Sequence, residues 1–292
     1  MIASVQAHLS LFDTALQPFL EREYWERYAE AERDKVLDWI WKFDSDDKHQ
    51  RTKGARAANT GHWFLNNPTF QNWLEGQNPR NATLFCPGLA GAGKTYITSL
   101  VVDKVLEMAG LQKGKIAVAF IYFEYRPKES PDSRGVAASI LRQWAQSQKD
   151  LDPELRKLYA EWRANRRTAN IPEFVCCMNS IATKLSSAFI ILDALDEWDS
   201  NERWIFLNRV VPHLDTTRTK VFATCRPHIE DVSKFFTNSD KLVIVAHEDD
   251  LKRYVTEKLK QIEPRKKRRF DQLGSILKDE IVDKLCTQAN GM

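Results

Sequence analysis

The feature that most constrains this sequence is a glycine-rich segment between two apolar runs. Residues 88–95 read Gly-Leu-Ala-Gly-Ala-Gly-Lys-Thr and meet the pattern Gly-x-x-x-x-Gly-Lys-Thr. The apolar run 82–86 before them is typical of a buried strand, and the run 95–109 after them is typical of a helix ended by Gly110. A strand, a glycine-rich turn and a helix in this order indicate a phosphate-binding loop.

The residue types in this loop indicate binding of a nucleoside triphosphate. Glycines let successive N–H groups point at phosphate oxygens, and the positive end of the following helix also faces the anion. We expect Lys94 to contact the β- and γ-phosphates and the Thr95 hydroxyl to ligate Mg²⁺. A turn without a ligand is the less favoured alternative. The expected nucleotide-binding residues are Gly88, Leu89, Ala90, Gly91, Ala92, Gly93, Lys94, Thr95 and Tyr96.

An apolar run ends on a carboxylate further along the chain. Residues 189–192 read Phe-Ile-Ile-Leu, and Asp193 follows. Ligands of open α/β sheets bind at the carboxyl ends of the strands, so we expect Asp193 beside the loop, holding Mg²⁺ directly or through water. Asp196 or Glu197 is expected to orient or deprotonate the attacking water. The alternative for these two residues is to cap the next helix.

Arg226 follows the next predicted strand, at residues 220–225, and Pro227 follows it. An arginine at this edge of the sheet can contact a γ-phosphate and sense its presence, which would make it part of the catalytic set with Asp196 and Glu197. Its position alone equally allows Arg226 to be a surface residue at the start of a loop, without a role in sensing phosphate.

Alternation of strands and helices predicts an α/β fold. We predict a P-loop NTPase three-layer α/β/α sandwich with a mainly parallel five-stranded sheet and right-handed crossovers. N-terminal linker helices come before it, and a C-terminal helical subdomain follows from residue 249. Residues 5–43 are expected to be helical with a break or kink at Pro18, and residues 44–59 to be a polar connector. The strands are expected at 82–86, 116–123, 189–192, 220–224 and 241–245, and helices at 68–74, 134–148, 153–166, 171–185 and 201–214.

Composition excludes several other classes of protein. The 292 residues are 43% hydrophobic and carry a net charge of +3, which is ordinary for a soluble globular protein. The sequence contains neither an apolar run of the about 18 residues that span a membrane nor a signal peptide. Five cysteines without Cys-x-x-Cys spacing argue against disulfides and zinc. We expect a cytoplasmic protein, with the nucleus as an alternative. The basic run 265–269 favours a solvated face over an import signal or a phosphate contact.

Together these motifs resemble a NACHT domain, the switch ATPase of the STAND class. Residues 193–197, Asp-Ala-Leu-Asp-Glu, are similar to the family's Walker B motif Asp-Gly-x-Asp-Glu, with Ala194 in place of glycine. Residues 224–227, Thr-Cys-Arg-Pro, resemble its sensor segment Thr-Ser-Arg-Pro. Residues 60–65 and 68–74 are similar to the lead-in of fungal NACHT proteins, which are also described as nephrocystin-like N-terminal domains.

The resemblance extends over about residues 36–292. It implies that ATP or GTP binds with Mg²⁺, that ADP is held at rest, that hydrolysis is slow, and that nucleotide controls self-oligomerisation through the NACHT domain. Such proteins act as fungal NOD-like receptors of immunity and incompatibility, with an effector domain before the NACHT domain and repeats after it. We therefore expect a part of a longer protein. The expected units are an N-terminal segment and linker at 1–60, the NACHT domain at 61–247 and a truncated helical subdomain at 248–292.

Two other functions fit the same motifs. One is an AAA+ DNA-associated ATPase of the initiator type, which could use the basic run, although the sequence has no recognition-helix pattern. The other is a binding-only module that holds ADP without turnover. Nucleic acid and membranes are not among the expected partners.

Overall fold

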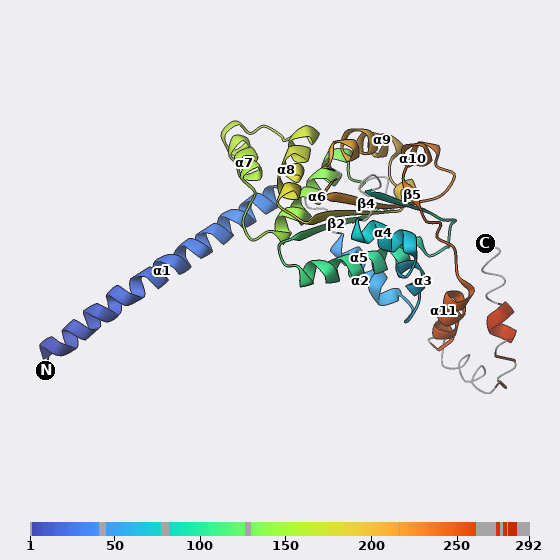
Figure 1. Cartoon of the computed structure of the whole chain (residues 1–292), viewed down its shortest axis with the longest axis horizontal. Coiled ribbons are helices and arrows are strands. Elements are labelled where there is room, and N and C mark those ends of the chain that lie inside the picture. Colours follow the sequence, from blue (N-terminus) through green and yellow to red (C-terminus); the bar gives the residue numbers. More distant parts are fainter. Residues whose placement is uncertain are drawn as a thin grey trace.

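A five-stranded sheet forms the centre of the molecule, with strand order β2-β3-β4-β1-β5 and all neighbouring strands parallel. The predicted three-layer α/β/α sandwich is confirmed (Figure 1). The strands are β1 Thr83–Pro87, β2 Ile116–Tyr122, β3 Ser187–Asp193, β4 Thr219–Cys225 and β5 Asp240–Lys241. The structure, a computed structural model, describes residues 2–40, 45–76, 82–125, 130–215, 217–260, 273–274, 277–278 and 280–284.

Helices cover both faces of the sheet (Figure 1). One face carries α2 Asp46–Ala55, α3 His62–Leu65, α4 Pro68–Glu75 and α5 Lys94–Leu111. The other carries α6 Ser133–Ser147, α7 Pro153–Asn165, α8 Ile171–Thr183, α9 Ser200–Arg209 and α10 Glu230–Phe235. Two 3-10 turns, η1 Leu195–Glu197 and η2 Val211–His213, flank α9. The first helix of the chain is α1 Ile2–Trp39, and α11 Glu248–Lys260 follows β5.

Side chains on the central strands alternate between two apolar clusters. In β2, Ala119 and Ile121 belong to the cluster beneath α6, whereas Phe120 and Tyr122 belong to the cluster beneath α5. Both faces are therefore dry, which is why these strands are almost wholly apolar in sequence. Since the strands are parallel, the carboxyl ends of β1, β3 and β4 meet at one edge, where the phosphate loop and Asp193 lie.

The break predicted at Pro18 is wrong, because α1 continues through this residue from Ile2 to Trp39. A proline removes one backbone N–H, and the hydrogen bonds on either side can continue the helix. Every residue from 17 to 30 is exposed, and this part of α1 projects away from the sheet domain (Figure 1). Near its carboxyl end, Val36 and Leu37 are buried against the core.

The polar connector predicted at 44–59 is also wrong, since most of it is helix α2. Polar contacts hold this helix to α5 and β2. The His49 ring lies with Nδ1 2.8 Å from the Tyr122 hydroxyl and Nε2 3.2 Å from an Asp103 carboxylate oxygen. Arg56 Nη2 donates to the other oxygen of Asp103 at 2.5 Å. Apolar periodicity cannot reveal a helix that is held in this way.

Two further boundaries differ from expectation. The predicted helix 201–214 is α9 followed by the turn η2, which carries Pro212. The predicted strand 241–245 is shortened to β5, although the chain beyond it still bonds to β1, with Ile244 N donating to the Pro87 carbonyl at 2.8 Å. Residues 261–272, which contain the basic run, lie outside the described residues. In the described part of the chain, every helix is too short or too polar to cross a membrane.

Burial of His49 predicts a dependence of stability on pH. Burial lowers the pKa of His49, and the Asp103 carboxylate opposes this shift only in part. A lowered pKa in the folded state gives stability that is present above the ordinary value of about 6.5 and lost as the pH falls through the folded value. We expect His49→Gln to lose less free energy of unfolding than the wild type between pH 7.5 and 5.5 in urea titrations. An equal loss, or the same effect from the exposed His228→Gln, would contradict this.

Candidate nucleotide site

The phosphate loop joins β1 to α5, and two of its glycines are required by geometry. Gly93 caps the amino end of α5 with φ of +89°, a conformation that side chains disfavour. At Gly88, a Cβ would lie 2.7 Å from the Ile244 carbonyl oxygen. The first N–H groups of α5 have no partner within the helix, and together with the helix dipole they favour an anion at this end. The loop therefore has the geometry of a phosphate cradle.

The side chain of Lys94 closes over this loop. Its Nζ donates to the carbonyl oxygens of Gly88 at 2.9 Å and Leu89 at 3.0 Å. These are neutral acceptors that a phosphate oxygen can replace with a stronger, charge-assisted bond. The arrangement of the loop residues predicted to bind nucleotide thus fits a polyphosphate.

Asp193 lies at the carboxyl end of β3 and is 1% exposed. Its Oδ1 accepts hydrogen bonds of 2.7 Å from both the Thr98 and the Thr224 hydroxyls, and the Thr95 hydroxyl also bonds to this carboxylate. Burial raises the pKa of Asp193, while the three hydroxyls and the Lys94 ammonium oppose that rise. The structure therefore brings together the two predicted Mg²⁺ ligands, Thr95 and Asp193. One carboxylate and one hydroxyl, completed by phosphate oxygens and water, are a donor set that suits Mg²⁺.

Asp196 and Arg226 form an ion pair at the same edge of the sheet. Arg226 Nε lies 2.9 Å from Asp196 Oδ2, and the Arg226 backbone N–H donates to Oδ1 at 3.1 Å. The Asp196 side chain is 5% exposed and that of Arg226 is 52% exposed. Glu197 is half-buried and accepts a bond of 3.3 Å from the backbone N–H of Tyr125. The helix-cap alternative for Asp196 and Glu197 is wrong, since Asp199 caps α9.

Arg203 is a residue near the site that the sequence motifs do not identify. It lies on α9 and is 5% exposed, and its Nη1 donates to the carbonyls of Leu195 at 3.0 Å and Trp198 at 2.9 Å. Its Nε and Nη2 bond to both oxygens of Asp231 at 2.9 and 3.2 Å. Arg203 thereby fixes the η1 turn that carries Asp196 and Glu197. In the sequence it is one basic residue in a short helix, and no local signal distinguishes it.

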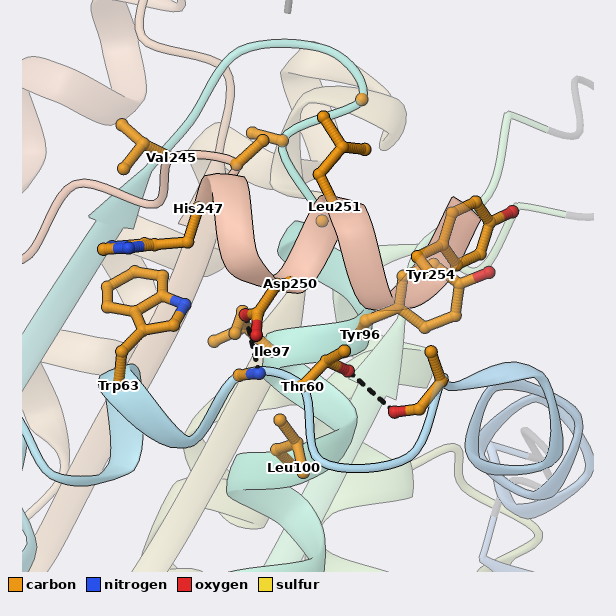
Figure 2. A pocket seen from close by; sticks show the side chains of 16 residues that line it. Thr60, Trp63, Tyr96, Ile97, Leu100, Val245, His247, Asp250, Leu251 and Tyr254 are labelled. Carbon is orange, nitrogen blue, oxygen red and sulfur yellow. Dashed lines mark hydrogen bonds between the residues drawn. The ribbon is translucent and has the colours of Figure 1, made fainter. Parts of the chain in front are cut away.

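A pocket of about 250 Å³ adjoins the phosphate loop. Figure 2 shows the Trp63 and His247 rings packed against each other on one side of it, with centroids 4.2 Å apart. Asp250, in the first turn of α11, accepts a bond of 2.8 Å from the Gly61 N–H. The full lining is Ala57, Thr60, Gly61, Trp63, Gly91, Ala92, Gly93, Tyr96, Ile97, Leu100, Val245, Ala246, His247, Asp250, Leu251 and Tyr254. Residues before the loop, in the loop and in α11 thus share one pocket, which sequence reasoning missed because no motif marks it.

The strand order, the glycine-rich loop after β1 and the buried Asp193 at the end of β3 define a P-loop NTPase fold. Residues 59–226 match the protein family described as "Nephrocystin 3, N-terminal", which is more than half of the chain. The chain belongs to this family. No match to a curated protein was found.

Solved structures that are similar to this chain include three proteins of low sequence identity. A Walker-type ATPase of Pyrococcus abyssi has 10% identity and a TM-score of 0.40, over 80% of this chain and 64% of that one. The Aeropyrum pernix ORC1 protein in complex with DNA has 19% identity and a TM-score of 0.42, over 77% of this chain and 53% of that one. C. elegans PCH-2 has 12% identity and a TM-score of 0.39, over 89% of this chain and 62% of that one. The chain spans less than two thirds of each of these proteins, and likeness at this level carries no argument about activity.

Ala194 predicts an unusual effect on stability. It follows Asp193 with φ of +56°, in the left-handed region, and it is 6% exposed. This conformation costs an L-residue roughly 1–2 kcal/mol, which outweighs the about 0.4–1 kcal/mol of extra chain entropy that glycine loses on folding. We expect Ala194→Gly to raise the free energy of unfolding by up to about 1 kcal/mol.

The matched control is Ala160→Gly, at an exposed helical position of α7. There the same substitution is expected to lower the free energy of unfolding by about 0.5–1 kcal/mol. Chemical denaturation of the three proteins measures both effects. Losses of similar size at the two positions would show that Ala194 is not strained.

Proposed function

We propose that this chain is a NACHT-type, STAND-class nucleotide switch. It binds ATP or GTP with Mg²⁺ and hydrolyses it slowly, and the bound nucleotide controls its conformation and assembly. The observation that carries this proposal is the buried Asp193, bonded to the Thr95 and Thr98 hydroxyls of the helix that begins at the phosphate loop. The resemblance of residues 193–197 and 224–227 to NACHT motifs supports the same class.

In this proposal the start of α5 holds the phosphates. Lys94 transfers its hydrogen bonds from the Gly88 and Leu89 carbonyls to phosphate oxygens. Thr95 and Asp193 hold Mg²⁺, which would neutralise charge on the phosphates. The α5 dipole adds to this stabilisation.

Arg226 is proposed to sense the γ-phosphate. Its side chain is paired with Asp196 and is half exposed, so a γ-phosphate can compete for it. Movement of Arg226 toward phosphate would free the Asp196 carboxylate, which with Glu197 could then orient water. The ion pair between Arg226 and Asp196 suits a resting state. Because this pair must break before Asp196 can orient water, the arrangement is consistent with slow turnover.

The pocket beside Trp63 is proposed to hold the nucleoside. It is lined by the phosphate loop and also by α11, which is tied to the segment before the loop through Asp250 and Gly61. Arg253 adds a bond of 2.5 Å to the Asn59 carbonyl. A nucleoside that fills this pocket would favour one placement of α11 over others, which is how binding would shift the population of conformations.

Partners and organisation follow from the resemblance. We propose a nucleotide-binding unit at 61–247 and a helical subdomain that begins with α11. Self-association through the nucleotide-binding unit, with an effector domain and repeats in a longer fungal NOD-like receptor, is the arrangement that the resemblance of residues 60–74 supports.

Lys94→Ala tests the phosphate site. Loss of one charge-assisted bond costs about 1.5–3 kcal/mol, so we expect at least a tenfold weaker Kd for ATP or GTP by calorimetry. Lys104→Ala, on the exposed side of the same helix and paired with Glu107, is the matched control and should bind normally. Chromatography of nucleotide released from the denatured wild type identifies what co-purifies. No co-purifying nucleotide and no binding of ATP or GTP with Mg²⁺ would refute the proposed function.

Trp63→Leu tests the nucleoside pocket separately from the phosphate loop. Loss of the indole should weaken ATP binding by about tenfold, because a ring contact is worth about 0.5–1.5 kcal/mol beyond the area it buries. Binding of inorganic tripolyphosphate, measured by competition, should not change. Trp204→Leu, at an exposed position of α9, serves as the control. Equal losses for ATP and tripolyphosphate would place the nucleoside elsewhere.

A further inference from the structure

Two threonine hydroxyls converge on a single oxygen of Asp193. Thr98 Oγ1 and Thr224 Oγ1 each lie 2.7 Å from Asp193 Oδ1, and all three residues are at most 1% exposed. Thr224 Oγ1 also accepts a bond of 2.9 Å from the Ala194 N–H. These hydroxyls are therefore part of a dry hydrogen-bonded group and not of a solvated surface.

The position of Thr98 on α5 gives it a role that no motif assigns. It lies three residues after Thr95, in the same helix as the loop lysine, and its Oγ1 is also 3.0 Å from the Lys94 carbonyl oxygen. A hydroxyl has one proton to donate, and the charged acceptor Asp193 forms the shorter and stronger bond. One side chain thus joins α5, whose first turn carries the phosphate-binding groups, to the carboxylate at the end of β3.

We propose that Thr98 is a positioning residue that fixes the Asp193 carboxylate for Mg²⁺. This rests on the proposed function, because it concerns how the metal is held beside the nucleotide. Donors from α5 and β4 both bond to Oδ1, so they hold the carboxylate in place at the end of β3. Ligands that are themselves held by hydrogen bonds bind metal more tightly, and loss of such a partner typically costs 10–100-fold in affinity.

The choice between Thr98 and its partner Thr224 follows from what each one joins. Thr224 bonds to Asp193 and to the adjacent Ala194 N–H, so it holds the end of β3 to β4 alone. Thr98 connects Asp193 to the helix that bears Lys94 and Thr95. Thr95 also bonds to this carboxylate, but it is itself a proposed Mg²⁺ ligand, whereas Thr98 is not. Loss of the Thr98 hydroxyl should therefore uncouple the metal ligand from the phosphate site without unpacking the sheet.

The experiment measures ATP affinity with Mg²⁺ and with EDTA in the full chain. In the wild type, Mg²⁺ should strengthen ATP binding. Thr98→Val keeps the shape of the side chain and removes its hydrogen-bond donor. We call the ratio of ATP affinity in Mg²⁺ to that in EDTA the gain from Mg²⁺, and we expect this gain to fall by about 10–100-fold while the affinity in EDTA is unchanged. Thr98→Ser restores a hydroxyl and should restore the gain. If Thr98→Val does not fold, Thr98→Ala and Thr98→Ser provide the same comparison, since they differ by one hydroxyl.

The control is Thr219→Val, in the same strand as Thr224. Thr219 is 2% exposed, and its hydroxyl has no hydrogen-bond partner among the described residues, so valine there should leave both stability and the gain from Mg²⁺ intact. A folded Thr98→Val with the full gain from Mg²⁺, or an equal loss of affinity in Mg²⁺ and in EDTA, would overturn the role of Thr98 alone. A wild type that binds ATP in neither condition would overturn the proposed function and this inference with it.

Discussion

The buried carboxylate of Asp193 is the constraint on which the arrangement of the site depends. An ionised carboxylate at 1% exposure is costly unless it is paired and hydrogen-bonded. The compensation comes from hydroxyls on two other elements, Thr95 and Thr98 on α5 and Thr224 on β4, together with the nearby Lys94 ammonium. Because these groups belong to three different elements, satisfying one charge fixes the start of α5 against the ends of β3 and β4. The phosphate loop is held in place as a consequence.

Local pattern was sufficient to predict most of this framework. The central strands are recognisable because both of their faces are buried, and the loop because its glycines meet steric and φ requirements that other residues do not. The contacts that complete the site join residues far apart in sequence, and no local pattern reports them. The bond from Thr98 to Asp193 spans 95 positions, and the contact of His49 with Tyr122 spans 73. The same reason explains why α2 and Arg203 were missed, since both are held by polar contacts and not by an apolar face.

The departure of Ala194 from the glycine expected at its position has a physical meaning in the structure. The chain turns sharply after β3 so that Asp193 stays buried while Asp196 and Glu197 return to the same edge of the sheet. That turn requires a left-handed residue, which glycine adopts freely and alanine adopts at a cost. Backbone strain of this kind persists where surrounding contacts enforce it, and here the Ala194 N–H is bonded to Thr224 while Arg203 holds the next carbonyl. The energy stored in the turn is therefore balanced by the same contacts that organise the site.

The two arginines beside the acidic turn differ in a way that bears on how a switch could work. Arg203 is buried, and its guanidinium is fully committed to two backbone carbonyls and to Asp231, so removing it would leave several groups unpaired in a dry region. Arg226 is half exposed, and its side chain bonds to one oxygen of Asp196, whose side chain is 5% exposed. A triphosphate offers more negative charge than a single carboxylate and can compete for the Arg226 side chain, while the Arg226 backbone N–H still donates to Asp196 Oδ1. In the proposed switch, Arg203 therefore keeps the acidic turn in place while Arg226 is the group that moves.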